Sequence, residues 1–365
     1  MSADLIIVLT AVLVAVPCAL LGTLLVLRQM AMMGDAISHA VLPGIVVAFF
    51  ISENLGALTA LVGAGIFGLL TAMLVEFLRN TGRVKEDSSI GIVFTALFAL
   101  GVFLVSKFAR DVHLDLNHVL YGEIAFAPLN VLLIGGLNLG PRSLWTLGIV
   151  TALAVGLILL LYKEMKIATF DPGLAAAVGL SPVLVHYLLM GAVSVTTVGA
   201  FDSVGAILVV AFLIVPPGAA YLLTERLSSM MALAVTLGIG SAIIGYYLAA
   251  VLDVAIAGMM AVVTGGFFML ALLLSPSHGL LANLLRHRRN RRSFTRNLLL
   301  AKLAGLGGHA TEEELAYGLD WDGSDVSRAL EDAARRGLLL RPTTREVAFT
   351  DKGRKAADKA VEISA

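Results

Sequence analysis

Long apolar stretches recur along the first three quarters of the chain, separated by short polar segments. The first, residues 5–27, contains no charged residue. At 1.5 Å of rise per residue it is long enough to cross a hydrocarbon core of about 30 Å. The only charge before it is Asp4, not the cationic segment of a secretory signal, so the pattern predicts a permanent span. Eight further spans are expected at 36–51, 55–78, 88–106, 143–162, 182–200, 204–223, 229–251 and 254–274.

The charges between these stretches predict an orientation. With nine spans and an outer N-terminus, the cationic residues concentrate in the inner loops, as is typical of cytoplasmic loops. The residues concerned are Arg28, Arg79, Arg83, Lys85, Lys163, Lys166, Arg226 and 286–292. We therefore expect the N-terminus outside and the C-terminus in the cytoplasm.

Two segments do not fit a simple span. Residues 107–142 contain a short apolar run, 124–137, interrupted by Pro128, Gly135 and Gly136, which favours a re-entrant or surface helix. Residues 163–181 form a cytoplasmic loop in which Asp171 and Pro172 supply the N-cap and first position of a short helix. Such an apolar helix packs either beneath its own bundle or against a soluble partner.

Composition divides the chain into two chemically different parts. The whole is 58% hydrophobic and 14% charged, with a mean hydropathy of +0.92 and zero net charge. Residues 1–283 hold 24 charged residues, whereas the much shorter 284–365 holds 28. This excludes a cytosolic enzyme, a secreted disulfide-linked domain and a disordered chain. The single cysteine, Cys18, permits no internal disulfide. We predict an all-α polytopic membrane domain over 1–283, a basic linker at 284–293 and a cytoplasmic domain at 294–365.

Asp35 and His39 are the most informative polar residues in the expected spans. Four residues apart on a helix, their side chains share one face. A carboxylate and an imidazole can ligate Mn²⁺, Fe²⁺ or Zn²⁺, and ionisable residues inside a membrane are costly enough to indicate function. The residues alone leave a second interpretation open, in which Asp35 caps the span and His39 pairs with it. As ligands they supply only half of a coordination shell, so a metal site would need a second subunit.

Other polar residues in and around the spans carry weaker signals. Asp202 and Asp253 fall at outer corners where solvation is favoured, and His186 is expected to be an interfacial histidine satisfied by backbone. Pro43 with Gly44 is expected to interrupt the second span, and Pro216 with Pro217 is either a hinge or a tolerated kink. An outer-loop group, favoured as solvated loop over a cation funnel, consists of Asp111, His113, Asp115 and His118.

The chain contains no Gly-x-x-x-x-Gly-Lys-Ser/Thr phosphate-binding loop, no His-Glu-x-x-His and no paired-cysteine zinc site. It is therefore not expected to hydrolyse ATP itself.

The last 72 residues alternate helical and strand patterns. Helices are expected near 294–305, 311–319 and 323–337, the second opened by a Thr311–Glu314 capping box. Residues 338–340 and 347–349 predict a hairpin, followed by a helix from 351 to 362. This order resembles a winged-helix (α+β) domain, in particular the N-terminal domain of iron-dependent repressors. Arg328, Arg335 and Arg336 would be available to phosphates on such a recognition helix, but the acidic residues around them oppose DNA binding. These are Asp320, Asp322, Asp325, Glu331 and Asp332. A protein-contact or regulatory appendage is favoured.

The segment 28–44, Arg-Gln-Met-Ala-Met-Met-Gly-Asp-Ala-Ile-Ser-His-Ala-Val-Leu-Pro-Gly, resembles the signature of manganese/zinc/iron ABC-transporter permeases. Residues 170–180 resemble that family's cytoplasmic coupling segment, and 275–280 the close of its last span. The resemblance covers about residues 1–283 and implies a type II ABC importer permease of a bacterial cytoplasmic (inner) membrane.

The same resemblance implies partners and site residues. The partners are a second permease protomer, two separate ATP-binding subunits and an extracytoplasmic metal-binding protein. Asp35 and His39 match the family's metal-coordinating pair, which favours the ligand interpretation. The residues that match the ATPase contact are Asp171, Pro172, Gly173, Leu174, Ala175, Val178, Gly179 and Leu180.

The function expected is therefore that of a dimeric permease importing a divalent transition-metal ion, with manganese favoured over iron and then zinc, and with no permanently bound cofactor. Whether the second protomer is identical stays open. An ion-coupled secondary transporter would explain the spans but not the docking helix, and would favour an internal repeat that the sequence lacks. A membrane-tethered regulator would explain the C-terminal domain but not nine spans.

Overall fold

The computed structural model describes residues 2–52, 57–108, 124–134, 137–275, 279, 295, 297–311, 314–315, 323–340 and 346–364. The chain divides into two compact units, Met1–His278 and Gly279–Ala365. The basic segment 284–293 and the outer-loop group at 111–118 lie outside the described residues.

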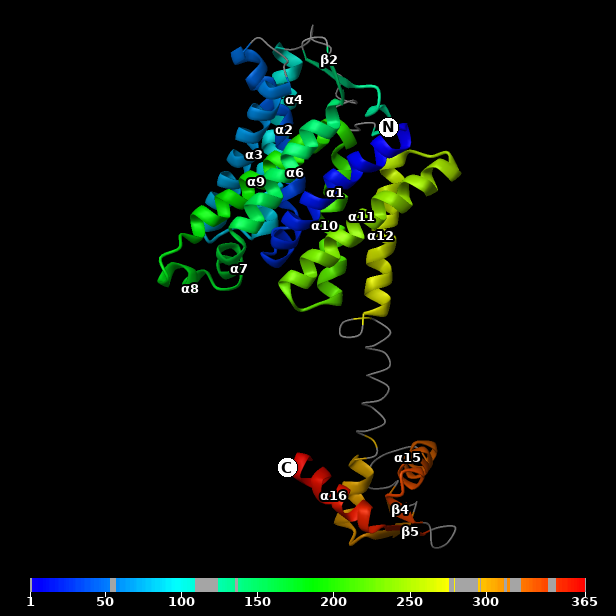
Figure 1. Cartoon of the computed structure of the whole chain (residues 1–365). Helices are drawn as coiled ribbons and strands as arrows, with labels where there is room; N and C mark the ends of the chain where they lie inside the picture. The colour runs from blue at the N-terminus through cyan, green and yellow to red at the C-terminus, as the bar shows by residue number, and fades with distance from the viewer. Residues whose placement is uncertain are drawn as a thin grey trace. The chain divides into compact units, whose positions relative to one another are not determined.

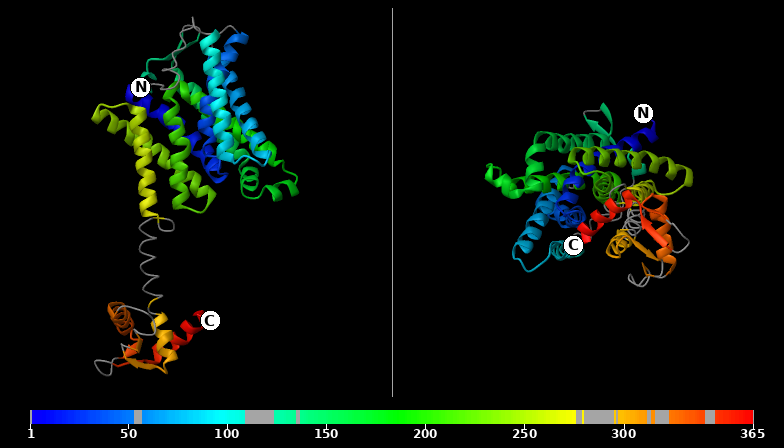
Figure 2. Two further views of the ribbon diagram at one scale, coloured as in Figure 1. Left: turned by 180° about the vertical axis from the view of Figure 1, so that it is seen from behind. Right: turned by 90° about the horizontal axis from the view of Figure 1, so that it is seen from below.

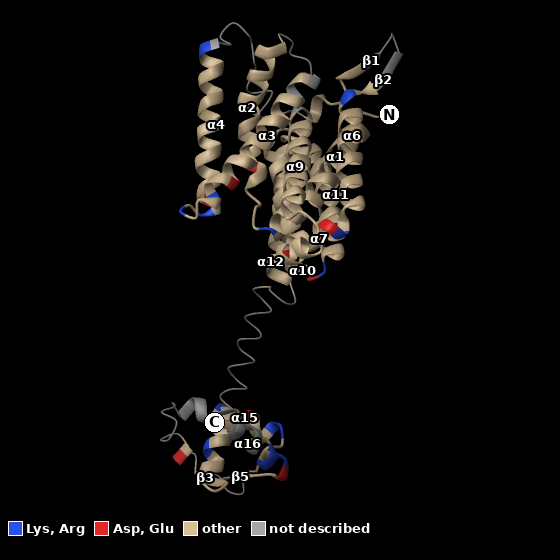
Figure 3. Cartoon of the chain, turned by 90° about the vertical axis from the view of Figure 1, so that its left-hand side faces the viewer, with Lys and Arg blue, Asp and Glu red and all other residues tan. Residues whose placement is uncertain are grey.

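The described part of the first unit contains nine helices long and apolar enough to cross a membrane, which confirms the number expected. They are α1 (Ala3–Leu27), α2 (Met33–Ser52), α3 (Ala57–Asn80), α4 (Glu86–Phe108), α6 (Arg142–Leu160), α9 (Pro182–Val204), α10 (Ala206–Leu223), α11 (Leu227–Leu252) and α12 (Ile256–Leu274). Charged residues gather toward the ends of these helices and leave long uncharged middles (Figure 3).

Helix α1 lies at the centre of the bundle and contacts α6, α9, α10 and α11 (Figure 1). Helices α2, α3 and α4 pack together on one flank, and α11 and α12 on the other, as the view from behind also shows (Figure 2). The core follows from this order: Val14, Leu21 and Leu24 of α1 are fully buried, together with Phe212 of α10. Gly22 lets α1 approach α10 closely, because a Cβ at this position would lie 1.8 Å from the carbonyl oxygen of Leu213.

Prolines do not break the described helices. We expected Pro43 to interrupt the second span, but α2 continues through it to Ser52, so that expectation is wrong. Pro216 and Pro217 likewise lie inside a continuous α10, and Pro17 inside α1. Neighbouring helices that pack against a proline can absorb the lost backbone hydrogen bond, as is common in membrane helices.

Residues 124–141 do not form the expected re-entrant or surface helix. A short 3-10 helix, η1 (Ile124–Phe126), precedes two antiparallel strands, β1 (Val131–Ile134) and β2 (Leu137–Pro141), with Ile134 paired to Leu137. The two residues between the strands, 135 and 136, are both glycine, and Gly-Gly favours a two-residue hairpin turn. Residues 135 and 136 themselves lie outside the described residues.

Two short helices connect α6 to α9. The expected one is confirmed as α8 (Pro172–Ala177): the backbone N–H of Leu174 donates to Asp171 Oδ1 at 2.8 Å, and Pro172 occupies the first turn. Gly179, with a φ of +85°, follows it. Residues 163–170 were expected to be loop, but they belong to a further helix, α7 (Tyr162–Phe170), which buries Met165 and Ala168.

The second unit has its own core, formed around Leu299, Leu303, Leu330 and Val347. Residues 297–305 are helical, and β3 (His309–Thr311), α15 (Gly323–Arg335), β4 (Leu339–Leu340), β5 (Glu346–Phe349) and α16 (Asp351–Ser364) follow. The strands form an antiparallel sheet in the order β3-β5-β4. The hairpin, α15 and α16 confirm the expected elements, β3 was not expected, and the winged-helix interpretation stays a prediction.

The capping box at Thr311 is confirmed. The backbone N–H of Glu314 donates to Thr311 Oγ1 at 3.3 Å, and the backbone N–H of Thr311 donates back to Glu314 Oε2 at 2.8 Å. These reciprocal bonds satisfy amide donors that a helix start otherwise leaves unpaired.

Candidate metal site

The segment 28–33 ends α1 and begins α2 in a tight reversal. The backbone N–H of Met30 donates to the Leu25 carbonyl at 2.9 Å, and that of Gln29 to the Val26 carbonyl at 3.0 Å. This is the Schellman pattern, and Gln29 occupies its left-handed position with a φ of 62°. The reversal places the start of α2, with Asp35 in its first turn, beside the end of α1.

Close packing fixes how α2 faces its neighbours. A Cβ on Gly34 would lie 2.0 Å from Leu213 Cδ2 of α10, and one on Gly44 would lie 2.7 Å from the Gly63 carbonyl oxygen of α3. At Gly44 the neighbour is backbone, which only glycine can approach so closely, whereas the atom near Gly34 is the end of a leucine side chain. The direction in which Asp35 and His39 project is therefore set by the packing of α2.

Asp35 and His39 face each other across one turn of α2, as their spacing predicts. His39 Nε2 lies 3.7 Å from Asp35 Oδ1, and the two side chains are 34% and 35% exposed, respectively. The imidazole packs against the rings of Phe94 and Phe98 of α4, with centroids 5.1 Å and 5.5 Å away. Its Nδ1 is buried and has no hydrogen-bond partner among the described residues. The pair is thus held by aromatic packing and remains partly open.

Two protein ligands are too few for a closed site. Within the part of the chain that the structure describes, no group of three or more His, Cys, Asp or Glu side chains could hold a metal ion. A structural transition-metal site takes about four ligands. Asp35 and His39 can therefore hold an ion only with water or with ligands from another chain.

A second carboxylate–imidazole pair, which the sequence analysis missed, joins α3 to α9. His186 Nε2 lies 3.9 Å from Glu76 Oε2, with side chains 11% and 18% exposed. We expected His186 to be satisfied by backbone, but its Nε2 has no hydrogen-bond partner in the described structure. The two residues are 110 positions apart, so no local pattern could reveal this pair.

Basic residues lie close to this second pair. Arg28 and Arg79 act electrostatically on His186. Arg28 also donates from Nε to Thr169 Oγ1 of α7 at 3.1 Å. The end of α1 is thereby tied to the segment that carries α8.

The segment from the end of α7 through α8 to its C-cap exposes three large apolar side chains. Phe170, Leu174 and Val178 follow one another at intervals of four residues and are 59%, 51% and 60% exposed. Ala175 on the opposite side is fully buried. Of the sequence-derived coupling residues only Ala175 is buried, and Leu174 and Val178 are the large apolar side chains among the exposed ones.

The outer corners carry no comparable arrangement among the described residues. Asp253 ends α11 in a left-handed conformation with a φ of 52°. Asp4, the only charge that precedes the first span, accepts a hydrogen bond from Tyr246 Oη at 2.6 Å and so joins α1 to α11. Both roles are structural.

Comparisons with known proteins point in one direction. A family model described as the ABC 3 transport family matches residues 5–275. The manganese transport system membrane protein MntD of Bacillus subtilis is 51% identical over 286 residues, covering 78% of this chain and 97% of its own. The zinc transport system membrane protein TroD of Treponema pallidum is 44% identical over 341 residues, covering 92% and 93%.

Among solved structures, PsaBC from Streptococcus pneumoniae in complex with Fab is similar to this chain. The TM-score is 0.62 at 32% identity, covering 74% of this chain and 91% of the other. The family model ends within the first unit, whereas the alignment with TroD is longer than that unit.

Proposed function

The chain belongs to the ABC 3 transport family, and we propose that it is the permease of an ATP-driven importer of divalent transition-metal ions, with manganese favoured over iron and zinc. The relatives named above are manganese and zinc transport proteins, which supports this class of cargo. The chain is a multi-pass membrane protein, and a bacterial inner membrane with the N-terminus outside agrees with its loop charges.

The proposal rests chiefly on one observation, the partly open Asp35–His39 pair on α2. A carboxylate oxygen and an imidazole nitrogen suit Mn²⁺, Fe²⁺ and Zn²⁺ alike, so these two residues select a class of cation and not one metal. With only two ligands from one chain, a second permease protomer would complete the shell by presenting its own pair. A partly hydrated, four-ligand site of this kind holds an ion only transiently, as transport requires.

The energy for transport would come from separate ATP-binding subunits. The sequence has no phosphate-binding loop, while Phe170 at the end of α7, Leu174 of α8 and Val178 at its C-cap are large exposed apolar side chains. Exposed apolar side chains grouped on a surface often mark a site where a partner protein binds. We assign the ATPase contact to residues 171–180, with Leu174 and Val178 as its apolar anchors.

Transport would proceed by alternating access. An extracytoplasmic metal-binding protein delivers the cation, and the Asp35 and His39 side chains of two protomers replace part of its water shell. ATP binding and hydrolysis in the partner subunits then move α8, and the bundle opens to the other side. The Arg28–Thr169 hydrogen bond offers a direct mechanical connection between α7 and the reversal that begins α2.

Metal uptake by the complete complex tests this function. We expect vesicles containing the permease and its ATP-binding subunits to accumulate radioactive Mn²⁺ only with ATP, with competition by Fe²⁺ and Zn²⁺ but not by Mg²⁺. Accumulation driven by an ion gradient without ATP would instead support a secondary transporter.

The docking face has its own test. Leu174→Asp combined with Val178→Asp should reduce ATP-dependent uptake to background, because carboxylates would disrupt the apolar contact, while the bundle still folds. Val183→Asp, on an equally exposed residue of the next helix, is the matched control. Normal uptake in the double variant would remove α8 from the coupling path.

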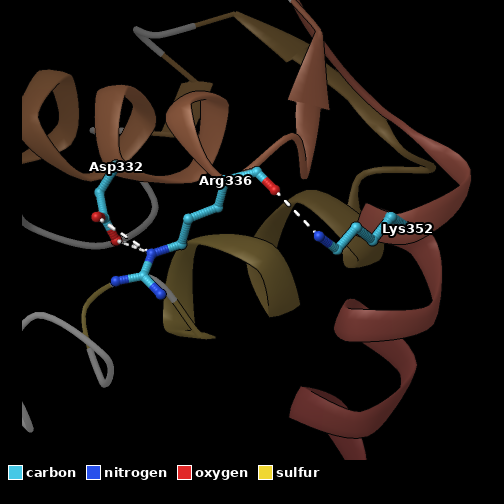
Figure 4. Close-up of polar contacts among 3 residues, drawn as sticks. All are labelled: Asp332, Arg336 and Lys352. Atoms are coloured by element: carbon cyan, nitrogen blue, oxygen red, sulfur yellow. Dashed lines mark hydrogen bonds and ion pairs between the residues drawn. The ribbon is translucent and has the colours of Figure 1, made fainter.

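For the second unit we propose a winged-helix appendage that contacts protein and not DNA. Two arginines at the end of α15 are engaged by carboxylates one turn earlier: Arg335 Nη2 lies 3.5 Å from Glu331 Oε2, and Arg336 Nε, just past the helix, lies 3.3 Å from Asp332 Oδ2. Lys352 of α16 donates to the carbonyl of Arg336 at 3.5 Å (Figure 4). Phosphates would have to displace these partners. Duplex DNA binding by the full chain with a steep salt dependence would contradict the proposal.

A further inference from the structure

The Glu76–His186 pair is largely removed from solvent and lies between the packed helices α3 and α9. Glu76 is in the last turns of α3, and His186 is in the first turns of α9. His186 is only 9% exposed. Helix α9 begins just after α8 and Leu180, so His186 is close in sequence to the segment to which we assign the ATPase contact.

The two facing atoms of this pair lack partners. Neither Glu76 Oε2 nor His186 Nε2 has a hydrogen bond within the described chain. Buried polar side-chain atoms are nearly always satisfied, so two unpaired atoms that face each other need an explanation. Their separation of 3.9 Å is too long for a hydrogen bond.

A shared cation accounts for this geometry. Two ligand atoms that each lie about 2.1 Å from one ion can be separated by at most roughly 4.2 Å, and 3.9 Å falls within that limit. Carboxylate and imidazole are also the donor types of the Asp35–His39 pair, so both pairs suit the same class of metal.

We propose that Glu76 and His186 form a second binding site for a divalent transition-metal ion, distinct from the Asp35–His39 site and joining α3 to α9. The class of cation assigned to this second site rests on the function proposed above. The positive charges of Arg28 and Arg79 act on His186, and they would repel a dication. The site would therefore bind more weakly than an all-acidic one and release its ion readily.

Cobalt binding to the complete complex tests this site. The complex is prepared in detergent with Asp35→Asn and His39→Asn, which silence the first pair, and Co²⁺ is titrated while its visible absorption is recorded. We expect one remaining Co²⁺ per permease chain, with its affinity lowered at least about 10-fold by His186→Gln or by Glu76→Gln. His309→Gln, at an exposed histidine of the second unit, is the matched control and should leave binding unchanged.

Two substitutions guard against misfolding as an explanation, since Glu76→Gln and His186→Gln act from different helices and both keep a polar side chain. Absence of Co²⁺ binding in the silenced background, or binding that neither substitution weakens, would overturn the site. If the unmodified complex imports no metal while His186-dependent Co²⁺ binding persists, the proposed function is wrong and this site stands. If it imports metal without any His186-dependent binding, the function stands and this site is wrong.

Discussion

Both units of the chain place carboxylates beside basic side chains, but the surroundings of these pairs differ. In the bundle, Asp35 and Glu76 face histidines, and the Glu76–His186 pair is largely removed from solvent. In the second unit, Glu331 faces Arg335 one turn along α15, and these side chains are 65% and 78% exposed. Water can solvate Glu331 and Arg335 separately, whereas it reaches the ions of the bundle only in part.

The difference bears on what each pair is for. An exposed ion pair contributes about 0–1 kcal/mol to stability, and its loss changes little. A carboxylate at membrane depth costs at least about 2.5–3.5 kcal/mol on insertion scales, so its presence there is better explained by function than by stability. Substitutions in the pairs of the bundle should therefore strongly reduce metal transport. Substitutions in the Glu331–Arg335 pair should change neither transport nor stability by much.

The largest effect is expected at the pair on α2. Asp35→Ala or His39→Ala should abolish metal uptake while the complex still assembles, because each removes one of only two ligands per chain. ATP-dependent Mn²⁺ accumulation in vesicles measures this. Ser38→Ala, on the same helix between the two, is the control, since its hydroxyl only bonds to the Gly34 carbonyl. Unchanged uptake in both alanine variants would overturn the assignment.

The next effect concerns the packing that brings α3 and α9 together. A Cβ on Gly68 would lie 1.9 Å from Ser194 Oγ, whereas one on Gly65, a turn away, meets nothing within 4 Å. Gly68→Ala should therefore destabilise the bundle by about 1–3 kcal/mol, and Gly65→Ala should be neutral or slightly stabilising. Thermal unfolding in detergent measures both, and equal melting temperatures would contradict this account of the helix contact.

Local sequence features predicted much of this fold. The nine spans depend on continuous apolar runs, and the Asp171 N-cap of α8 and the Thr311 capping box depend on neighbours within four residues; all are present. The facing of Asp35 and His39 also follows from their helical spacing. The error at 124–141 was local as well, because Gly135-Gly136 was interpreted as a helix interruption although it is also a hairpin signal.

Other features depend on contacts between distant segments. Glu76 and His186 meet only because α3 packs on α9, and neither residue carries a signal for the other in the sequence. Pro43 was expected to break α2 because the rule for an isolated helix was applied to one supported by its neighbours. The second ligand pair was missed for the same reason as the continuity of α2: tertiary packing decides both.

A smaller effect is expected at Glu314 in the second unit. The backbone N–H and the hydroxyl of Thr311 both donate to this carboxylate, and they hold its pKa below the usual 4.5. A lowered pKa in the folded state means that the charged form stabilises above about pH 4.5, and that this contribution is lost as the pH falls through the lowered pKa. Glu314→Gln should therefore loosen residues 297–311 more at pH 7 than at pH 3.

Hydrogen exchange, corrected for its intrinsic pH dependence, measures that difference in the full chain. Glu346→Gln, at an exposed position of β5, is the control and should change exchange equally little at both pH values. An effect of Glu314→Gln that is larger at pH 3 would reverse the sign derived from the capping box.

The smallest effect is expected at the exposed Glu331–Arg335 pair of α15. Glu331→Gln should change the free energy of unfolding of the second unit by about 0.5 kcal/mol or less, because water already solvates both Glu331 and Arg335. The backbone carbonyl of Arg336 also accepts a hydrogen bond from Lys352 (Figure 4). Chemical denaturation of the full chain, followed by hydrogen exchange in α15, measures the change.

The same loss of one carboxylate charge at Glu76 should weaken metal binding at least about 10-fold, because there the carboxylate is largely removed from water and faces His186. If Glu331→Gln lowered the free energy of unfolding by several kcal/mol, solvent exposure would not explain how the ion pairs of the two units differ. The functional interpretation of the Glu76–His186 pair would then lose its physical basis.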